Sequence, residues 1–208
     1  MKDINKILNV LEETYPDAQC ELNYTTPFEL LIATILSAQC TDVRVNKVTA
    51  ELFKKYNTPE AFLKLSTQEI SEKIKSCGLY KSKAQKIKVT SEMLCEFYNG
   101  EVPDILEELI KLPGVGRKTA NVVLSNAFNQ DAMAVDTHVF RVSNRIGIVH
   151  TKTPEKTEFA LMEVIPKKRW SNSHHLLIFH GRRICKARNP ECKVCPIKND
   201  CNYYVAQI

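Results

Sequence analysis

Apolar residues recur along most of the chain with the three- and four-residue spacing of amphipathic helices. The first run places Ile4, Ile7, Leu8 and Leu11 on one helix face. Residues 28–38 are apolar nearly all round, which indicates a central helix packed on several sides. Similar patterns predict further helices near residues 42–56, 67–76, 81–98, 104–111, 117–128, 137–146, 154–165 and 172–184. Since no segment alternates convincingly with a period of two, the pattern predicts an all-α protein of about ten short helices.

Capping signals mark four helix beginnings. Threonine-proline pairs stand at 26–27, 58–59 and 153–154, and each places a capping hydroxyl before a proline at the first helical position. Ser66 and Glu69 form a capping box.

The composition fits a globular protein of one large or two small domains. Of the 208 residues, 44% are hydrophobic and 25% are charged, and six glycines and nine prolines exclude a collagenous or low-complexity chain. No apolar run approaches the roughly 18 residues of a membrane span, and the amino terminus lacks a signal core. We therefore expect a cytosolic protein. The only candidate domain boundary is a composition shift near Gln130.

Basic residues gather near the carboxy end. The formal net charge is only +5, but between residues 166 and 198 nine cations face a single acid, Glu191. These cations are Lys167, Lys168, Arg169, Arg182, Arg183, Lys186, Arg188, Lys193 and Lys198. They predict a patch that binds a polyanion, with a merely solvated basic face as the alternative.

A turn with two glycines joins two apolar helices at residues 112–120, which read LPGVGRKTA. Gly114 and Gly116 permit positive φ and close approach by another backbone. The turn can therefore direct N–H groups outward at the positive end of the following helix, which predicts an anion site. For a DNA ligand the anion would be a backbone phosphate, bound without regard to sequence. A plain helix turn is the alternative, but it explains less easily two glycines that flank Val115 and precede Arg117.

Lys118 falls in the first turn of that second helix, where the helix dipole disfavours an ammonium. Desolvation in a closed site would favour the free amine further, and a free lysine amine is a nucleophile. Lys118 is therefore a candidate nucleophile, although a lysine that only binds a phosphate has the same sequence signature.

Asp136 directly precedes a helix that contains Val139 and Phe140, so it is an expected N-cap. A capping carboxylate can also take a proton or stabilise positive charge on a sugar. A permanent ion pair would keep the Lys118 amine charged. We therefore expect Asp136 to lie near Lys118 without a tight salt bridge.

The eight cysteines form two groups. The scattered four are interpreted as small hydrophobic residues of apolar helices: Cys20, Cys40, Cys77 and Cys95. The others lie close together: Cys185, Cys192, Cys195 and Cys201. Four thiolates so close predict a metal site, because disulfides are disfavoured in a reducing cytosol. Spacing alone admits zinc or an iron-sulfur cluster, and the single Cys-x-x-Cys hook favours the cluster. The simplest role of such a cluster is to shape the basic patch.

Four signatures, in order from about residue 26 to residue 201, resemble those of the endonuclease III family of helix-hairpin-helix DNA glycosylases with lyase activity. They are Ser37–Gln39 with Thr41–Asp42, Gly78–Tyr80 with Ser82–Ala84, the hairpin with Lys118 and the run Val135–His138, and the four terminal cysteines. The resemblance implies an all-α, two-domain fold with a cleft between the domains. A six-helix barrel with the hairpin would span residues 21–131. An iron-sulfur domain would combine residues 1–20 and 132–208, with a 4Fe-4S cluster held by Cys185, Cys192, Cys195 and Cys201.

The resemblance also implies base excision repair of oxidised pyrimidines in double-stranded DNA. The damaged nucleotide would leave the duplex, and Gln39 and Leu79 would fill the space. From the residues alone, Leu79 can equally be a core leucine after a helix cap. Lys118 would attack the sugar C1′ to form a Schiff base whose β-elimination nicks the strand, with help from Asp136. The expected DNA contacts also include Gly114, Val115, Gly116, Arg117 and His138. The expected protein is a monomer in a prokaryotic cytoplasm, associated with the nucleoid when acting on damaged or abasic DNA.

Two alternatives stay open at this point. A non-enzymatic helix-hairpin-helix protein with a redox-sensing cluster would keep the hairpin and the cysteines, but gives no reason for Lys118 with Asp136. Mismatch-specific glycosylases of the same fold lack the lysine. Two departures from the family pattern, Cys40 and Lys81, stand beside the filling residues and point to an effect on lesion preference.

Overall fold

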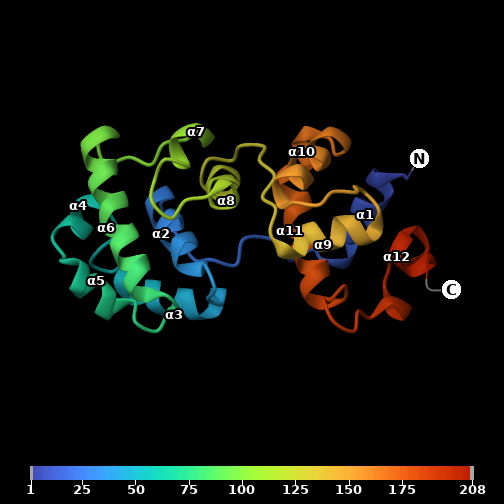
Figure 1. Cartoon of the computed structure of the whole chain (residues 1–208), viewed down its shortest axis with the longest axis horizontal. Helices are drawn as coiled ribbons and strands as arrows, with labels where there is room; N and C mark the ends of the chain where they lie inside the picture. The colour runs from blue at the N-terminus through green and yellow to red at the C-terminus, as the bar shows by residue number, and fades with distance from the viewer. Residues whose placement is uncertain (1, 207–208) are drawn as a thin grey trace. The chain divides into compact units, whose positions relative to one another are not determined.

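The computed structural model of the chain describes residues 2–206, and that range contains helices and no strand (Figure 1). In chain order the α-helices are α1 (Ile4–Thr14), α2 (Pro27–Ser37), α3 (Asp42–Leu52), α4 (Pro59–Leu63), α5 (Thr67–Lys73), α6 (Tyr80–Phe97), α7 (Leu106–Leu109), α8 (Arg117–Ala127), α9 (Thr137–Ile146), α10 (Pro154–Val164), α11 (Trp170–Arg183) and α12 (Asn202–Val205). Three 3-10 helices are η1 (Lys167–Arg169), η2 (Cys192–Val194) and η3 (Lys198–Asp200). The all-α prediction is confirmed.

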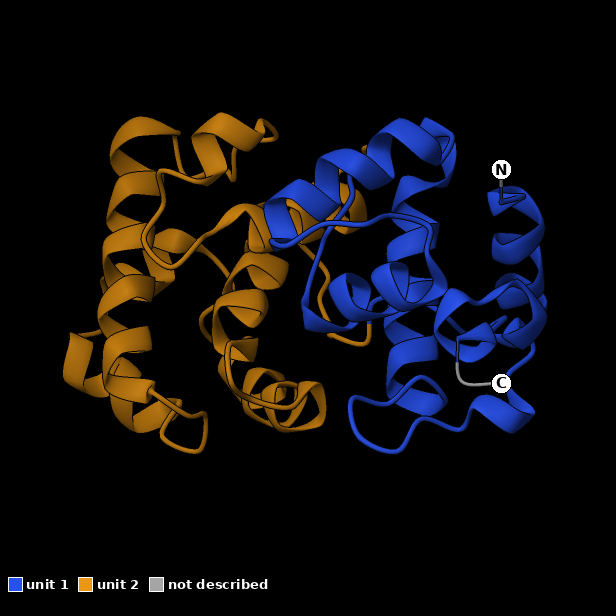
Figure 2. Cartoon of the chain, turned by 45° about the vertical axis from the view of Figure 1, so that its right-hand side comes forward, with its two compact units in different colours: residues 1–20, 131–208 blue, residues 21–130 orange. Residues whose placement is uncertain are grey.

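The chain divides into two compact units, coloured separately in Figure 2. Residues 21–130 form one unit, which contains α2 to α8. Residues 1–20 and 131–208 form the other, which contains α1 and α9 to α12. Asp131, assigned from the sequence to the unit with the hairpin, belongs to the second unit. The interpretation of the units as a barrel domain and a cluster domain stays a prediction.

The four predicted helix beginnings are all present. The hydroxyl oxygens of Thr26, Thr58 and Thr153 each accept a hydrogen bond from the backbone N–H three residues on. Ser66 and Glu69 complete a reciprocal capping box. Each cap satisfies a donor that the first helical turn leaves without an intrahelical partner.

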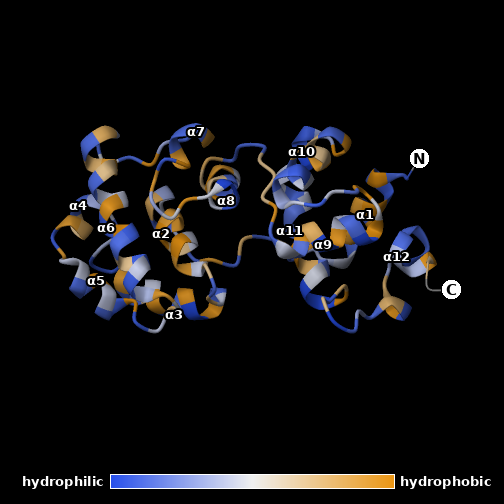
Figure 3. Ribbon diagram, in the orientation of Figure 1, coloured by the Kyte–Doolittle hydropathy of each residue, from blue (hydrophilic) through white to orange (hydrophobic). Residues whose placement is uncertain are grey.

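Helix α2 is the centre of the unit formed by residues 21–130. Residues 28–36 of this helix are all buried, and its ribbon is largely hydrophobic in Figure 3. It packs against α3, α6 and α8, which explains why it is apolar on several sides. The prediction of a central helix is confirmed.

In the other unit, α9 packs against α11, and α1 and α10 add their apolar faces to the same core. Ile7, Leu8 and Leu11, predicted to share one face of α1, are all buried there. The sequence patterns missed α12 and the three 3-10 helices, which are too short for a helical period. No described helix is both long and apolar enough to cross a membrane.

Candidate active site and metal centre

The turn between α7 and α8 is anchored on the core of its own unit. Gly114 has φ +85°, and a Cβ at this position would lie 3.1 Å from Cδ of Lys86 and 3.6 Å from Cγ2 of Ile35. The hydroxyl of Thr90 donates to the carbonyl oxygen of Pro113 at 3.0 Å. Glycine is thus required at 114 both by the backbone conformation and by packing on α2 and α6.

Gly116 differs from the prediction. Its φ of −92° and ψ of 175° are extended, so positive φ is not the reason for this glycine. A Cβ at 116 would have no neighbour within 4 Å, which leaves open space above the backbone. The N–H of Val115 donates to the carbonyl of Leu112 at 3.1 Å, whereas those of Gly114 and Gly116 donate to no acceptor in residues 2–206. The N–H groups of Gly114 and Gly116 can therefore receive an anion, whereas that of Val115 is already used within the turn.

Lys118 is the second residue of α8, directly after Arg117, and its side chain is exposed. The Nζ atom has no hydrogen-bond or ion-pair partner within residues 2–206. The position is therefore that of an accessible amine in the first turn of a helix, beside an open glycine backbone.

Asp136 is the N-cap of α9, as predicted. Its Oδ1 atom accepts hydrogen bonds from the backbone N–H groups of His138 and Val139, both at 2.8 Å. Within residues 2–206, Oδ2 accepts no hydrogen bond. The cap thus fixes the carboxylate through one oxygen and leaves the other for different chemistry. Asp136 and Lys118 belong to different units, and their proximity stays a prediction.

His138 is half-buried on α9, close to the backbone of α11. Its Nδ1 atom lies 3.2 Å from Nη2 of Arg141, and a Cβ at Gly181 would lie 3.0 Å from the His138 Cβ. Burial lowers the pKa of His138, with Arg141 adding to the effect and Asp136 opposing it. A hydrogen bond between the imidazole and the Gly181 backbone opposes the fall as well. The ring is thus held against the backbone of α11, with Nδ1 facing the guanidinium of Arg141.

The structure brings together the two residues expected to fill the space left in DNA. Gln39 and Leu79 are exposed non-glycine residues with φ of 54° and 58°. A Cβ at Gly78 would lie 3.1 Å from the carbonyl oxygen of Gln39, so the two turns are in contact. The interpretation of Leu79 as a core leucine is wrong, because 59% of it is exposed. Left-handed conformations of such residues cost about 1 to 3 kcal/mol and cluster at functional sites.

The four terminal cysteines line one cavity in the unit that contains α9 and α11. Cys185, Cys195 and Cys201 are buried and Cys192 is half-buried. Within residues 2–206, no three His, Cys, Asp or Glu side chains form a group that could hold a metal ion. The donor set is nevertheless one of thiols only, which suits an iron-sulfur cluster. Burial, together with the other thiols, raises the pKa of Cys195 to about 11.

Two side-chain nitrogens lie within hydrogen-bonding distance of the sulfur atoms of this cavity. Nη1 of Arg145 lies 3.7 Å from Sγ of Cys185, and Nε2 of His180 lies 3.6 Å from Sγ of Cys195. Nδ1 of His180 in turn lies 2.9 Å from the hydroxyl of Tyr15. Such hydrogen bonds stabilise thiolate charge and tune a bound metal.

Arg145 also fixes the loop after the first of these cysteines, and sequence reasoning missed it. Its guanidinium donates to the carbonyl oxygens of Lys186 at 2.7 Å and Ala187 at 3.0 Å, and lies 4.6 Å from the ring centroid of Tyr203. In the sequence it is one arginine in the last turn of a helix, where a favourable interaction with the helix dipole is sufficient explanation.

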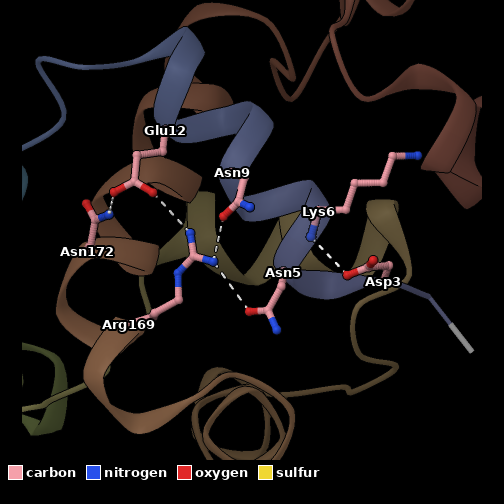
Figure 4. Close-up of polar contacts among 7 residues, drawn as sticks. All are labelled: Asp3, Asn5, Lys6, Asn9, Glu12, Arg169 and Asn172. Carbon is pink, nitrogen blue, oxygen red and sulfur yellow. Dashed lines mark hydrogen bonds and ion pairs between the residues drawn. The ribbon is translucent and has the colours of Figure 1, made fainter.

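The basic patch carries less free charge than predicted. Arg169 pairs with Glu12 at 3.1 Å and donates to Asn9 at 2.8 Å and Asn5 at 3.4 Å (Figure 4). Asn172 holds the other oxygen of Glu12 at 2.8 Å. Arg169 therefore joins α1 to η1, where its charge is balanced by an acid from the amino-terminal helix.

Two more cations of the patch have acid partners. Arg183 pairs with Asp17 at 2.5 Å, and Lys186 pairs with Glu191 at 2.5 Å. The hydrogen bond from Arg183 lowers the pKa of Asp17. With Arg169, at least three of the nine predicted cations are thus paired, two of them with acids that lie far away in the sequence.

A family model described as HhH-GPD superfamily base excision DNA repair protein matches residues 32–167. The chain is 51% identical to Endonuclease III of Bacillus subtilis over 202 residues, which cover 97% of this chain and 92% of that protein. It is 50% identical to Endonuclease III of Escherichia coli K12 over 198 residues, which cover 95% and 94%.

Solved structures agree with these sequence matches. A trapped endonuclease III–DNA covalent intermediate matches with a TM-score of 0.93 at 50% identity, over 98% of this chain and 96% of that one. A thermostable thymine-DNA glycosylase matches with a TM-score of 0.85 at 26% identity, over 97% and 96%. The match to proteins named Endonuclease III does not favour a non-enzymatic DNA-binding module. With its hairpin, Lys118, Asp136 and four cysteines in place, the chain belongs to the endonuclease III family of the HhH-GPD superfamily of base excision DNA repair proteins.

Proposed function

We propose that the protein removes oxidised pyrimidines from double-stranded DNA and cuts the strand at the resulting abasic site, with Lys118 as nucleophile. The observation that carries this proposal is the exposed Lys118 amine, which has no partner in residues 2–206 and stands beside a hairpin open to a phosphate. The solved structure of a trapped covalent intermediate between a similar protein and DNA supports it.

The reaction follows from a free amine and a sugar carbon. The Lys118 nitrogen forms a bond to C1′ while the bond from C1′ to the damaged base breaks, and the base leaves with a proton. Loss of a proton from nitrogen and opening of the sugar give a Schiff base. The Schiff base acidifies C2′, so that loss of a C2′ proton breaks the C3′–O bond and nicks the strand.

Asp136 supports these steps through the oxygen that does not cap α9. A carboxylate near C1′ stabilises the positive charge that develops as the base leaves, and it can take the proton released by the amine. His138, in the first turn of α9, is the further side chain that contacts a DNA phosphate in this proposal.

Gln39 and Leu79 fill the space from which the damaged nucleotide turns out. The exposed Leu79 side chain is an apolar wedge, and Gln39 has the amide groups needed to pair with the orphaned base. Their turns are in contact through Gly78, so both side chains are presented from one place.

The two hairpin glycines provide a matched pair of substitutions. Gly116→Ala is expected to change the free energy of unfolding by less than about 1 kcal/mol, because its φ suits alanine and its Cβ meets nothing. It is expected to weaken binding of abasic-site DNA by about tenfold, since the methyl group occupies the space of the phosphate. Chemical denaturation and fluorescence anisotropy measure the two quantities.

Gly114→Ala is the control in which the main change is expected in the free energy of unfolding. It is expected to lower the free energy of unfolding by about 1 to 2 kcal/mol, because alanine is strained at φ +85° and crowds Lys86. Unchanged DNA affinity in the stable Gly116→Ala variant would contradict the phosphate site.

We further assign a 4Fe-4S cluster to Cys185, Cys192, Cys195 and Cys201, on the basis of their shared cavity and of the Arg145 and His180 nitrogens that face their sulfur atoms. Bound there, the cluster would supply metal–thiolate bonds that cross-link residues 185–201. This segment has only two 3-10 helices of its own, and Arg145 holds its first loop from α9. Hydrogen bonds from Arg145 thus position the loop after Cys185, and the cysteines provide the remaining constraints on this segment.

The function is tested by trapping with borohydride, which reduces a Schiff base to a stable amine. A duplex that contains thymine glycol should become covalently attached to the protein, and an undamaged duplex of the same sequence should not. Release of the base without any trapped complex would instead indicate a glycosylase that uses water as nucleophile.

A further inference from the structure

Lys83, in the signature Ser82–Ala84, is buried although its side chain ends in an amine. It is 3% exposed, and its Nζ atom donates a hydrogen bond to the backbone carbonyl oxygen of Leu36 at 2.7 Å. This carbonyl belongs to the last turn of α2, whose carbonyl groups have no partner within the helix. Lys83 itself lies on α6. The reaction proposed above makes no use of this side chain.

The hydrogen bond lies directly before the turn that presents Gln39. Ala38 has φ −57° and ψ 114°, and Gln39 has φ 54°. The N–H of Cys40 donates to the Ser37 carbonyl at 3.0 Å, so Cys40, like Cys77, lies in a turn and not in an apolar helix. These angles are close to those of a type II turn, which usually holds glycine or asparagine at the position of Gln39. A glutamine in this conformation is strained and must be held by its surroundings.

Leu79, the second residue expected to fill the space in DNA, is bonded to the same lysine. It is the N-cap of α6, with φ 58° and ψ 28°. Its carbonyl oxygen accepts a hydrogen bond from the backbone N–H of Lys83 at 3.0 Å. A Cβ at Gly78 would lie 3.1 Å from the Gln39 carbonyl oxygen, so the two turns are in contact. Lys83 is thus bonded to Leu79 through its backbone and to the end of α2, just before Gln39, through its side chain.

Two simpler roles explain this lysine less well. Packing does not require an amine, because methionine has a similar length without the cost of burying a charge. Burial lowers the pKa of Lys83, which reflects that cost. Capping of a helix end requires no particular neighbour: Lys88, on the same helix, donates to the carbonyls of Leu63 and Leu65, both at 2.9 Å, around the end of α4. What distinguishes Lys83 is that both backbones it joins lead to an exposed left-handed residue.

We propose that Lys83 is a positioning residue for the pair Gln39 and Leu79. Its amine holds the end of α2 against α6, so that both strained turns keep the spacing needed to enter the duplex together. Without the amine, the Leu36 carbonyl loses its partner and the Gln39 turn can move relative to Leu79. This inference rests on the proposed role of the pair in filling the space left by the damaged nucleotide. A displacement of about 1 Å at such a site can cost about a hundredfold in rate.

Lys83→Met tests this role in the full-length protein with its cluster, because methionine keeps the buried stem and removes the donor. We expect base release from thymine glycol DNA to fall by about tenfold to a hundredfold. Lys88→Met is the matched control, since it removes an amine of the same helix that holds α4 rather than α2. It should stay within about twofold of wild type. Equal losses in the two variants would overturn the proposal, because the loss of any capping lysine of α6 would then explain them.

A fluorescence measurement separates positioning from a merely structural role. The duplex carries an uncleavable tetrahydrofuran site opposite 2-aminopurine, a base whose fluorescence rises when an inserted side chain unstacks it from its neighbours. At saturating protein, wild type and Lys88→Met should both raise the fluorescence. Lys83→Met should give less than about half of that rise, because the inserted pair no longer has a fixed spacing. A full rise with Lys83→Met would refute the positioning role.

A second comparison uses the variant Gln39→Ala/Leu79→Ala, in which nothing remains to be positioned. In this background Lys83→Met should change the rate by less than about twofold, because a residue that acts through the pair has no effect once the pair is gone. The same large loss in both backgrounds would show that Lys83 acts through the fold as a whole, contrary to the proposal. If Lys83→Met does not fold, Lys83→Gln, whose amide ends one bond short of the amine, takes its place in every comparison.

The fluorescence measurement also separates this inference from the proposed function, since it requires no reaction. If the wild type does not act on thymine glycol DNA, the proposed function fails while the 2-aminopurine signal still tests Lys83. If the wild type binds the tetrahydrofuran duplex without any rise in fluorescence, Gln39 and Leu79 do not enter the DNA, and the inference fails with them.

Discussion

Lys118→Gln is expected to lower the rate of strand cutting at thymine glycol by at least about a thousandfold, because the amide nitrogen of glutamine cannot form a Schiff base. The free energy of unfolding should change by no more than about 0.5 kcal/mol, since Lys118 is exposed and has no partner within residues 2–206. Binding of damaged DNA should persist, because the hairpin backbone is untouched. Gel assays of incision and anisotropy measurements of affinity separate these effects.

Lys156→Gln is a matched control for this variant. Lys156 is also an exposed lysine in the first turn of an 11-residue helix, α10, but no glycine hairpin precedes it. Its replacement should leave incision within about twofold of wild type. Equal losses of activity in the two variants would show that general charge, and not covalent chemistry, explains the effect of Lys118.

Removing a cysteine of the cavity is expected to have the second largest effect. Cys195→Ala should release most of the iron and leave residues 185–205 without a fixed structure, because the binding energy of a structural metal is part of the folding energy. The segment contains only two 3-10 helices and the short α12. Iron analysis and limited proteolysis measure the two outcomes, with new cleavage expected within this segment.

Cys95→Ala is the matched control, since Cys95 lies in the other unit and its thiol faces the carboxylate of Glu60. It should retain iron at the wild-type level. A wild-type protein that contains zinc without iron, or a Cys195→Ala variant with full iron content, would contradict the assignment of the cluster.

The helices and their beginnings could be predicted from the sequence because the signals are local. A threonine before a proline at 26, 58 or 153 defines its own cap, and the spacing of Ile7, Leu8 and Leu11 defines a buried face. The ends of the helices are harder to predict. Helix α3 ends at Leu52 rather than near 56, and α7 is only four residues long, because side-chain periodicity continues into turns.

The failures concern contacts between distant parts of the chain. The pairing of Arg169 and Arg183 with Glu12 and Asp17 depends on α1 lying against α11, which no local pattern shows. The contact between the turn of Gln39 and the turn of Gly78 depends in the same way on segments that are distant in the sequence.

The helix dipole alone does not identify Lys118 as a nucleophile. Lys156 is also a lysine in a first helical turn, that of α10, with no glycine hairpin before it. What distinguishes Lys118 is the anchored hairpin before it, with Gly114 packed on α2 and α6 and open space at Gly116.

The most direct test of the account is to locate the covalent bond. Protein trapped on thymine glycol DNA with borohydride would be digested with protease and nuclease, and the modified peptide sequenced by mass spectrometry. We expect a reduced deoxyribose adduct on Nζ of Lys118 and on no other residue. An adduct on a different lysine or on the amino terminus would contradict it.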